Sequence, residues 1–226
     1  MAREKTIFLS SSLPEDTDTH SLLDSYGFQI IAFSLIELVP IKQPPPPPMD
    51  WVFFYSKNAL KFFIELFGVE KLGAYKIGLL GPSALPLLKN IELQAHYVGN
   101  GAPQSSVKAF THILGESKVL IPTATHSMRR LPLELKKPDQ YTEIDLYQNQ
   151  IKSKVLIPEA DVYLFTSPLN VESYLFNGGK ITQPAIAIGP STLKALEENN
   201  FNQSILCEKP SKDQLIMAGI KYLFKK

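Results

Sequence analysis

Short apolar runs alternate with longer stretches of helical spacing along most of this chain. The runs predict strands directly after Asp50 and Asp161 and at residues 5–9, 28–33, 76–80, 94–98, 118–121, 141–147, 185–188 and 204–207. Proline-led starts and helical spacing predict helices between them, such as residues 104–114 and 193–198. Strands that alternate with helices in this way indicate an α/β fold with parallel sheets and right-handed crossovers.

One stretch of this pattern occurs twice. Residues 50–63 and 161–175 share an acid, an apolar run, a hydroxyl pair and a helix start, and Tyr55-Ser56 lies 111 positions before Thr166-Ser167 (166 − 55). Each copy predicts a strand that is covered on both faces and turns directly into a helix. The free N–H groups of such a helix start, together with the hydroxyls, are suited to hold an anionic ligand.

Two further pairs of similar residues are separated by nearly the same number of positions. Gly81 and Gly189 stand in similar stretches 108 positions apart (189 − 81), and Pro103 precedes Pro210 by 107 positions (210 − 103). Matches in one order at nearly constant spacing indicate an internal duplication. The second copy lacks the last strands of the repeat, and the N-terminal residues have a strand and helix pattern that can supply them.

The duplication therefore predicts two parallel-sheet α/β lobes, one of them discontinuous in sequence. Residues 1–38 and 153–226 are expected to form the discontinuous domain, and residues 42–145 the inserted one. The two crossings, 35–41 and 144–152, are extended enough to pair as a two-stranded antiparallel linker. We expect strand C-termini and helix N-termini of both domains to face a common cleft, and the thin linker to allow hinge motion.

Composition narrows the classes of function. The chain of 226 residues, 44% of them hydrophobic, is long enough for two ordinary domains with separate cores. Its 23 basic and 22 acidic residues give a formal net charge of +1 and are spread along the sequence, which argues against a nucleic-acid partner. No apolar stretch is long enough to span a membrane, and the single cysteine, Cys207, suits a reducing compartment and a core position. We expect a cytoplasmic monomer.

Five consecutive prolines at residues 44–48 precede the first copy of the repeated stretch. Such a run cannot join a helix or a central strand, and it predicts a surface loop or a polyproline II spacer. A recognition motif for an SH3-like partner is the alternative interpretation.

Other familiar site chemistry is missing from the sequence. The four histidines are far apart, with no i, i+4 pair and no cysteine partner, which argues against a metal site of the zinc type. Residues 189–192 resemble a phosphate loop but lack its Gly-Lys-Ser/Thr ending. Because neither Ser11, Ser56 nor Ser167 lies in a Gly-x-Ser-x-Gly elbow, a serine hydrolase is not expected.

A family resemblance spans nearly the full chain. It rests on residues 50–59, 146–148, 164–168 and 187–192. They resemble uroporphyrinogen-III synthase, the lyase family of heme and porphyrin biosynthesis that closes the linear tetrapyrrole hydroxymethylbilane with inversion of its last ring. The resemblance implies two α/β domains with a two-stranded linker and a reaction without cofactor or metal. In that reaction the terminal hydroxyl leaves, and the substituted carbon of the last ring attacks the azafulvene to give a spiro intermediate, which opens and recloses.

The resemblance also implies which residues act. A substrate with eight carboxylates needs many donors, and helix starts of both domains supply them. The predicted substrate-binding residues are Ser10, Ser11, Tyr55, Ser56, Asn58, Gly81, Ser83, Ala102, Ser105, Thr166, Ser167, Gly189, Ser191 and Thr192. Helix capping without a ligand is the alternative explanation of these positions. Tyr147 matches the family's tyrosine on the returning linker, placed to donate a proton to the departing hydroxyl, with amphipathic packing as the alternative.

Two features depart from the family pattern. Many relatives carry Thr-Arg-Pro after the first strand, whereas this chain has Ser10-Ser11-Ser12, so the expected guanidinium is absent or comes from elsewhere, with Arg129 and Arg130 as candidates. The proline run is also longer than the family linker needs. The alternative from another functional class is a non-catalytic bilobal sensor or carrier of an acidic small molecule, which the same scaffold would serve.

Overall fold

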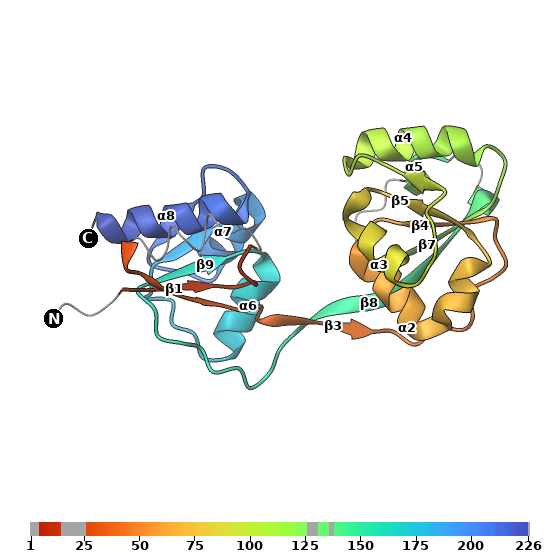
Figure 1. The fold of residues 1–226 in the computed structure, drawn as a ribbon. Helices are drawn as coiled ribbons and strands as arrows, with labels where there is room; N and C mark the ends of the chain where they lie inside the picture. The colour runs from red at the N-terminus through yellow and green to blue at the C-terminus, as the bar shows by residue number, and fades with distance from the viewer. Residues whose placement is uncertain (1–4, 15–25, 126–130, 136–137, 226) are drawn as a thin grey trace. The chain divides into compact units, whose positions relative to one another are not determined.

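The computed structural model describes residues 5–14, 26–125, 131–135 and 138–225. The chain divides into two compact units (Figure 1), which we call the split unit, Met1–Glu37 with Gln150–Lys226, and the inserted unit, Leu38–Asn149. Residues 15–25 and the candidates Arg129 and Arg130 lie outside the described residues.

The split unit is built on a parallel five-stranded sheet in the order β11-β10-β9-β1-β2. Its strands are β1 (Thr6–Leu9), β2 (Gln29–Ala32), β9 (Val162–Phe165), β10 (Ala185–Ala187) and β11 (Ser204–Leu206). Its described helices are α6 (Pro168–Phe176), α7 (Pro190–Glu198) and α8 (Lys212–Phe224). The strands are parallel, so all of their carboxyl ends lie at one edge.

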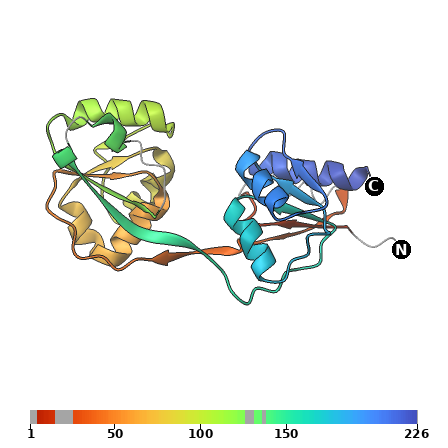
Figure 2. The same cartoon turned by 180° about the vertical axis from the view of Figure 1, so that it is seen from behind.

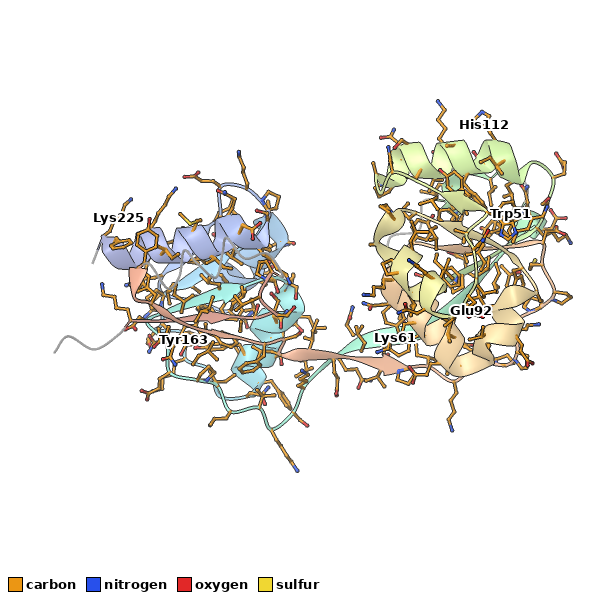
Figure 3. The ribbon with its side chains drawn as sticks, viewed as in Figure 1. Trp51, Lys61, Glu92, His112, Tyr163 and Lys225 are labelled. Atoms are coloured by element: carbon orange, nitrogen blue, oxygen red, sulfur yellow. The ribbon has the colours of Figure 1, made fainter. Side chains whose placement is uncertain are left out.

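Both faces of this sheet are covered, which explains the continuous apolar runs of its strands. Phe8 packs in the core with residues of α6 and α7, whereas Ile7 and Leu9 pack in the core with residues of α8. Tyr163 (labelled in Figure 3) lies in the first of these two cores. Figure 2 shows α6 and α7 side by side. The alternation of side chains along a strand thus divides the apolar residues between two layers of helices.

The inserted unit has a six-stranded sheet in the order β3-β8-β7-β4-β5-β6. Its strands are β3 (Ile36–Pro40), β4 (Trp51–Phe54), β5 (Lys76–Leu79), β6 (Tyr97–Val98), β7 (Val119–Ala124) and β8 (Tyr141–Ile151). Its helices are α2 (Lys57–Gly73), η1 (Pro82–Ala84), α3 (Leu85–Asn90), α4 (Pro103–Leu114), α5 (Leu131–Glu134) and η2 (Pro138–Gln140). Among the described helices of both units, none is long and apolar enough to cross a membrane.

Two cores flank this second sheet as well. Val52 and Phe54 pack in the core that holds α2, whereas Trp51 and Phe53 pack in the core that holds α4 and α5. Trp51 (labelled in Figure 3) meets Phe110 of α4 edge to face, with ring centroids 5.2 Å apart. The predicted α/β class with parallel sheets is confirmed.

The acid that opens each copy of the repeated stretch ties neighbouring strands together. Asp161 Oδ2 accepts a hydrogen bond from the Thr6 N–H at 2.7 Å, and Asp50 Oδ2 accepts one from the Lys118 N–H at 2.8 Å. In both units the carboxylate therefore satisfies an N–H at the start of the adjacent strand, that of the first residue of β1 and that of the residue before β7. The repeated acid has a structural role that is equivalent in the two copies.

Three predicted strand boundaries are wrong, and one of these strands, β8, runs to Ile151 instead of ending at residue 147. β6 covers only Tyr97–Val98 instead of residues 94–98, because the His96 side chain, through Nδ1, accepts the Ile77 N–H that a longer ladder would bind. β7 runs through Pro122 to Ala124 instead of ending at residue 121. Pairing with β8 continues to Ala124, although β4 pairs with β7 only through Leu120.

The segments that connect the units are β3 and the end of β8, which are neighbours in the sheet order. Ile41 N donates to Leu146 O at 2.8 Å and Lys152 N donates to Leu35 O at 3.0 Å, so the two segments run antiparallel. The proline run follows β3, where Pro46 is buried and Tyr75 Oη donates to Pro47 O at 3.1 Å. These contacts within the inserted unit favour the loop interpretation of the run.

Burial of two packed tyrosines predicts alkaline sensitivity. Tyr163 and Tyr174 lie with ring centroids 5.0 Å apart, and loss of hydration raises the pKa of both, most strongly that of Tyr174. The folded state therefore holds these protons more tightly than the unfolded state, in which the pKa is about 10. This contribution to stability is complete below pH of about 10 and is lost as the pH rises toward the folded values.

We therefore expect the free energy of unfolding to fall above this pH, and less steeply for Tyr174→Phe than for the wild-type chain. Urea titrations at several alkaline pH values measure the two slopes. Equal slopes for the two chains would show that other groups govern the loss.

Candidate functional site

In the split unit, the hydroxyl residues after β1 and β9 form one hydrogen-bonded cluster. The register that places Leu9 beside Leu164 brings Ser10 next to Thr166. Thr166 N donates to Ser10 Oγ at 2.9 Å, and Thr166 Oγ1 donates to Ser10 O at 3.1 Å. Ser10 is fully buried, so its hydroxyl holds two strands together, whereas Ser11 beside it is half-buried.

Ser167 is the N-cap of α6 and is half-buried. Its Oγ accepts the Asn170 N–H at 3.3 Å and Asn170 Nδ2–H at 2.9 Å. A hydroxyl has two acceptor lone pairs and one proton. Because Asn170 occupies both lone pairs, the proton of Ser167 is the group left for another partner.

The turn after β10 presents a second helix start in the same unit. Gly189 is the N-cap of α7, has no side chain to satisfy the helix N–H groups, and precedes Pro190. Ser191 is exposed, whereas Thr192 is 1% exposed and packs inward. The open donors of this turn are therefore those of Ser191 rather than the hydroxyl of Thr192.

A lysine that the sequence interpretation missed lies at the same edge. Lys212 is the first residue of α8, and its Nζ donates to Ser12 O at 3.0 Å. Ser12 follows Ser10 and Ser11 at the end of β1, so this ammonium group lies beside the turn in which the sequence lacks the arginine of the family pattern. The helix-starting serine before Lys212 is the only sequence signal for it.

In the inserted unit, a β-bulge turns Tyr147 toward α2. Thr123 pairs with Asp145 and Ala124 pairs with Tyr147, which leaves Leu146 as the extra residue of β8. In a regular strand Leu146 and Tyr147 would face opposite sides. Both pack instead in the core that holds α2, since a bulge re-aims the side chains that follow it.

Tyr147 is held there by a ring contact and a hydrogen bond. Its ring stacks on Phe62 of α2 with centroids 4.7 Å apart and an interplanar angle of 16°, and it is 7% exposed. Its Oη lies 3.2 Å from Ser56 Oγ, which also accepts the Ala59 N–H at 3.1 Å as the N-cap of α2. The structure thus brings together two of the predicted residues, Ser56 and Tyr147.

Two neighbours of Ser56 behave differently from each other. Tyr55 packs against Phe53 in the core with α4, and its Oη accepts the Leu131 N–H, so the hydroxyl is directed away from Ser56. Asn58 is exposed in the first turn of α2. Lys57, which lies between Ser56 and Asn58 and was not predicted, adds a positive charge to this turn.

The turns after β5 and β6 touch each other through glycine. A Cβ on Gly81 would lie 2.7 Å from the Cα of Gly101, so these backbones are in contact. Ser83, two residues after Gly81, is exposed. The Asn100 side chain, a residue that sequence reasoning missed, organises the second turn, because its Oδ1 accepts the Ala102 N–H at 3.0 Å and the Ser105 hydroxyl at 3.0 Å. The predicted donors Ala102 and Ser105 are therefore partly used within their own loop.

Each unit consequently carries a row of donors at the carboxyl edge of its sheet. We define the split-unit row as Ser11, Ser167, Ser191 and Lys212, and the inserted-unit row as Ser56, Lys57, Asn58, Ser83 and Tyr147. The open groups of these rows are hydroxyls, amides and ammonium groups. Such rows are suited to bind carboxylates, which accept charge-assisted hydrogen bonds.

Comparisons with known proteins agree with this picture. A family model described as uroporphyrinogen-III synthase HemD matches residues 17–217. The structure is similar to uroporphyrinogen-III synthetase from Helicobacter pylori 26695, with a TM-score of 0.69 and 18% identity over 96% of this chain and 99% of that one. A mutant uroporphyrinogen III synthase from the extremely thermophilic bacterium Thermus thermophilus is similar with a TM-score of 0.50 and 17% identity, over 98% and 100% of the two chains. A search of curated protein sequences finds no match.

Proposed function

The chain belongs to the uroporphyrinogen-III synthase family, and we propose that Tyr147 acts in its reaction as the proton donor to the departing hydroxyl. The protein is a lyase of tetrapyrrole biosynthesis, and its family acts on a tetrapyrrole substrate. The observation that carries the proposed role is the 3.2 Å contact between Tyr147 Oη and Ser56 Oγ on a bulged strand. The family membership favours this activity over a non-catalytic carrier.

The contact with Ser56 supports proton donation by Tyr147. Hydroxide is a poor leaving group, so the terminal hydroxyl of hydroxymethylbilane needs a proton as its bond to carbon breaks. If Ser56 donates to Tyr147 Oη, the phenol proton is left to point at the departing oxygen. The Ala59 N–H and the Phe62 ring fix the positions of Ser56 and Tyr147, respectively.

The donor rows supply the second part of the proposal, which is to bind the substrate carboxylates. Lys57 and Lys212 are each the first residue of a helix, where a cation is disfavoured by the helix dipole. A bound carboxylate would reverse this penalty, since it pairs with the lysine and with the free N–H groups together. Hydroxymethylbilane has eight carboxylates, and we infer that the donors of each row are suited to bind groups of this kind.

Product analysis tests the activity directly. The chain is incubated with hydroxymethylbilane generated enzymatically, and the uroporphyrinogen isomers are resolved after oxidation. We expect the type III isomer, with inversion of the last ring. Only the type I isomer, at the rate found without protein, would contradict the proposed function and leave a carrier role.

Removal of the Ser56 hydroxyl tests its part in orienting Tyr147. We expect Ser56→Ala to lower kcat by roughly 3- to 10-fold, because the phenol proton loses its preferred direction. The same change removes a helix N-cap, which costs about 1 kcal/mol of stability. Ser211→Ala is the matched control, since Ser211 caps α8 in the same way, with Gln214 N donating to its Oγ at 3.3 Å. Equal losses of kcat in the two variants would point to helix capping alone.

We also propose that the protein works as a cytoplasmic monomer on hydroxymethylbilane. Its nearly balanced and evenly spread charge supports the absence of a nucleic-acid partner. Light scattering on the eluted chain is expected to give the mass of one chain, 25.3 kDa. A mass of two chains would contradict the monomer.

A further inference from the structure

Helix α6 carries a stripe of polar side chains toward the interior of the split unit. Asn170, Ser173 and Asn177 are spaced i, i+3 and i+7 and therefore lie on one face of the helix. Asn170 is 3% exposed, Ser173 is fully buried and Asn177 is half-buried. Apolar residues usually fill this spacing on a buried helix face, so the polar stripe needs a specific reason.

The stripe binds the backbone where the two connecting segments leave the split unit. Asn170 Oδ1 accepts the Leu35 N–H at 3.1 Å, and Ser173 Oγ donates to Leu35 O at 2.6 Å. Asn177 Nδ2 donates to Lys152 O at 2.7 Å, and its Oδ1 accepts the Val155 N–H at 2.9 Å. All three side chains therefore bind backbone next to the connecting segments, either at the residue before β3 or at the residues that follow β8.

Asn170 differs from Asn177 because it also reaches the donor row. Its Nδ2 donates to Ser167 Oγ at 2.9 Å and to Thr166 Oγ1 at 3.3 Å. Together with the Leu35 N–H, these bonds use both donors and the acceptor of the side-chain amide. The amide cannot rotate without breaking all three contacts.

This fixed amide decides which hydroxyl proton is available. The proton of Thr166 Oγ1 is directed to Ser10 O, and its oxygen accepts from Asn170, so Thr166 is satisfied inside the cluster. Ser167 Oγ accepts twice from Asn170, so its only free group is the proton. A hydroxyl that is compelled to donate is suited to a carboxylate, which can only accept.

We propose that Asn170 is a positioning residue. It orients the Ser167 hydroxyl so that it donates to a substrate carboxylate, and it links this donor to Leu35, the residue before β3. The inference rests on the proposed function, because the carboxylate belongs to the family's substrate. It adds a residue that contacts no substrate itself and acts through Ser167.

The internal duplication supports a specific role for this amide. The residue that corresponds to Asn170 at the offset of 111 positions is Ala59 (170 − 59), so the first copy has no such side chain. There the serine of the pair, Ser56, receives only the Ala59 N–H from its own helix, and Tyr147 is its other partner. The equivalent serines of the two copies thus have different second hydrogen-bond partners. Ser167 has a side chain of its own helix, and Ser56 has a side chain of a distant strand.

The test compares Asn170→Ala with Asn177→Ala, since each variant removes a side chain of α6 or of its C-cap that anchors a connecting segment. We expect Asn170→Ala to raise KM for hydroxymethylbilane by roughly 5- to 30-fold, as the loss of one or two oriented hydrogen bonds predicts, with kcat nearly unchanged. We expect Asn177→Ala to leave KM within about twofold of the wild-type value, because hydrogen bonds that do not reach the donor row affect stability alone. In hydrogen exchange without substrate, the Leu35 amide should lose protection in the first variant and the Val155 amide in the second.

Two results would overturn the inference. One is a wild-type KM in Asn170→Ala together with fast exchange at Leu35, which would leave only a structural anchor. The other is an equal rise of KM in both variants, which would assign the effect to the connecting segments. If Asn170→Ala does not fold, Asn170→Asp replaces it: the carboxylate keeps the acceptor for Leu35 and lacks the donors to Ser167, so a wild-type KM there overturns the proposal too. Absence of turnover in the wild-type chain would instead reject the proposed function, and the exchange data would stay interpretable.

Discussion

Replacing Tyr147 with phenylalanine is expected to lower kcat by about 10- to 100-fold and to leave KM nearly unchanged, at the low end of the range for acid catalysis. The change removes the hydroxyl that meets Ser56 and keeps the ring that stacks on Phe62. Activity should persist because the terminal hydroxyl of the substrate also departs without a catalyst and the donor rows still position the reacting ring. Initial rates over a range of hydroxymethylbilane concentrations separate kcat from KM, and the product should still be the type III isomer.

Tyr75→Phe is the matched control for this experiment. Tyr75 is also a buried tyrosine of the inserted unit, 5% exposed, and its hydroxyl donates to Pro47 O at 3.1 Å. Loss of either hydroxyl costs about 1 kcal/mol of stability, so the two variants should unfold similarly. Only Tyr147→Phe should show the lowered kcat. A kcat that is unchanged in Tyr147→Phe would remove the tyrosine from the reaction and support the packing alternative.

Gly81→Ala is expected to destabilise the protein by about 1–3 kcal/mol, the range for overpacking a tight contact. The new Cβ would lie 2.7 Å from the Cα of Gly101 and 3.0 Å from its nitrogen, and these are backbone atoms that cannot turn away. The Gly81 φ of −162° is open to any residue, so the cost arises from the contact alone. The turn after β6 should shift, because Gly101 N donates to Leu80 O at 2.9 Å.

The duplication supplies the control for this glycine. Gly189 corresponds to Gly81, has nearly the same backbone angles (φ −161°, ψ 174°), and is likewise an N-cap without a side-chain bond. A Cβ on Gly189 would meet no atom within 4 Å. Alanine is a poorer N-cap than glycine at both positions. Urea unfolding should therefore show a larger loss for Gly81→Ala than for Gly189→Ala, and equal losses would show that the contact with Gly101 yields easily.

Local patterns in the sequence predict many of the strands and helix starts that the structure shows. Apolar runs predict the strands Trp51–Phe54 and Val162–Phe165, because a strand that is buried on both faces needs apolar side chains at successive positions. Ser56 and Ser167 were expected at helix starts, and both cap their helices. These features depend on residues within one turn or one strand, so the chain can specify them without reference to distant segments.

The donor site needed more than these local patterns. Tyr55 and Ser56 are adjacent, yet the hydroxyl of Tyr55 accepts a bond from Leu131 while that of Ser56 meets Tyr147. Thr192 has the residue type expected of a donor but faces the core. Lys212 joins Ser12 across 200 positions of sequence. The direction of each side chain depends on which distant segment packs against it.

The sequence by itself determined the duplication, the order of strands and helices, and the hydroxyl residues at the strand ends, because these follow from composition and spacing along a continuous stretch. Only the tertiary structure decided that Leu146 is the extra residue of a bulge that turns Tyr147 toward Ser56, and that Asn170 leaves Ser167 with a single free proton. Strand register and hydrogen-bond direction are properties of pairs of segments, and each partner here lies far away in the chain.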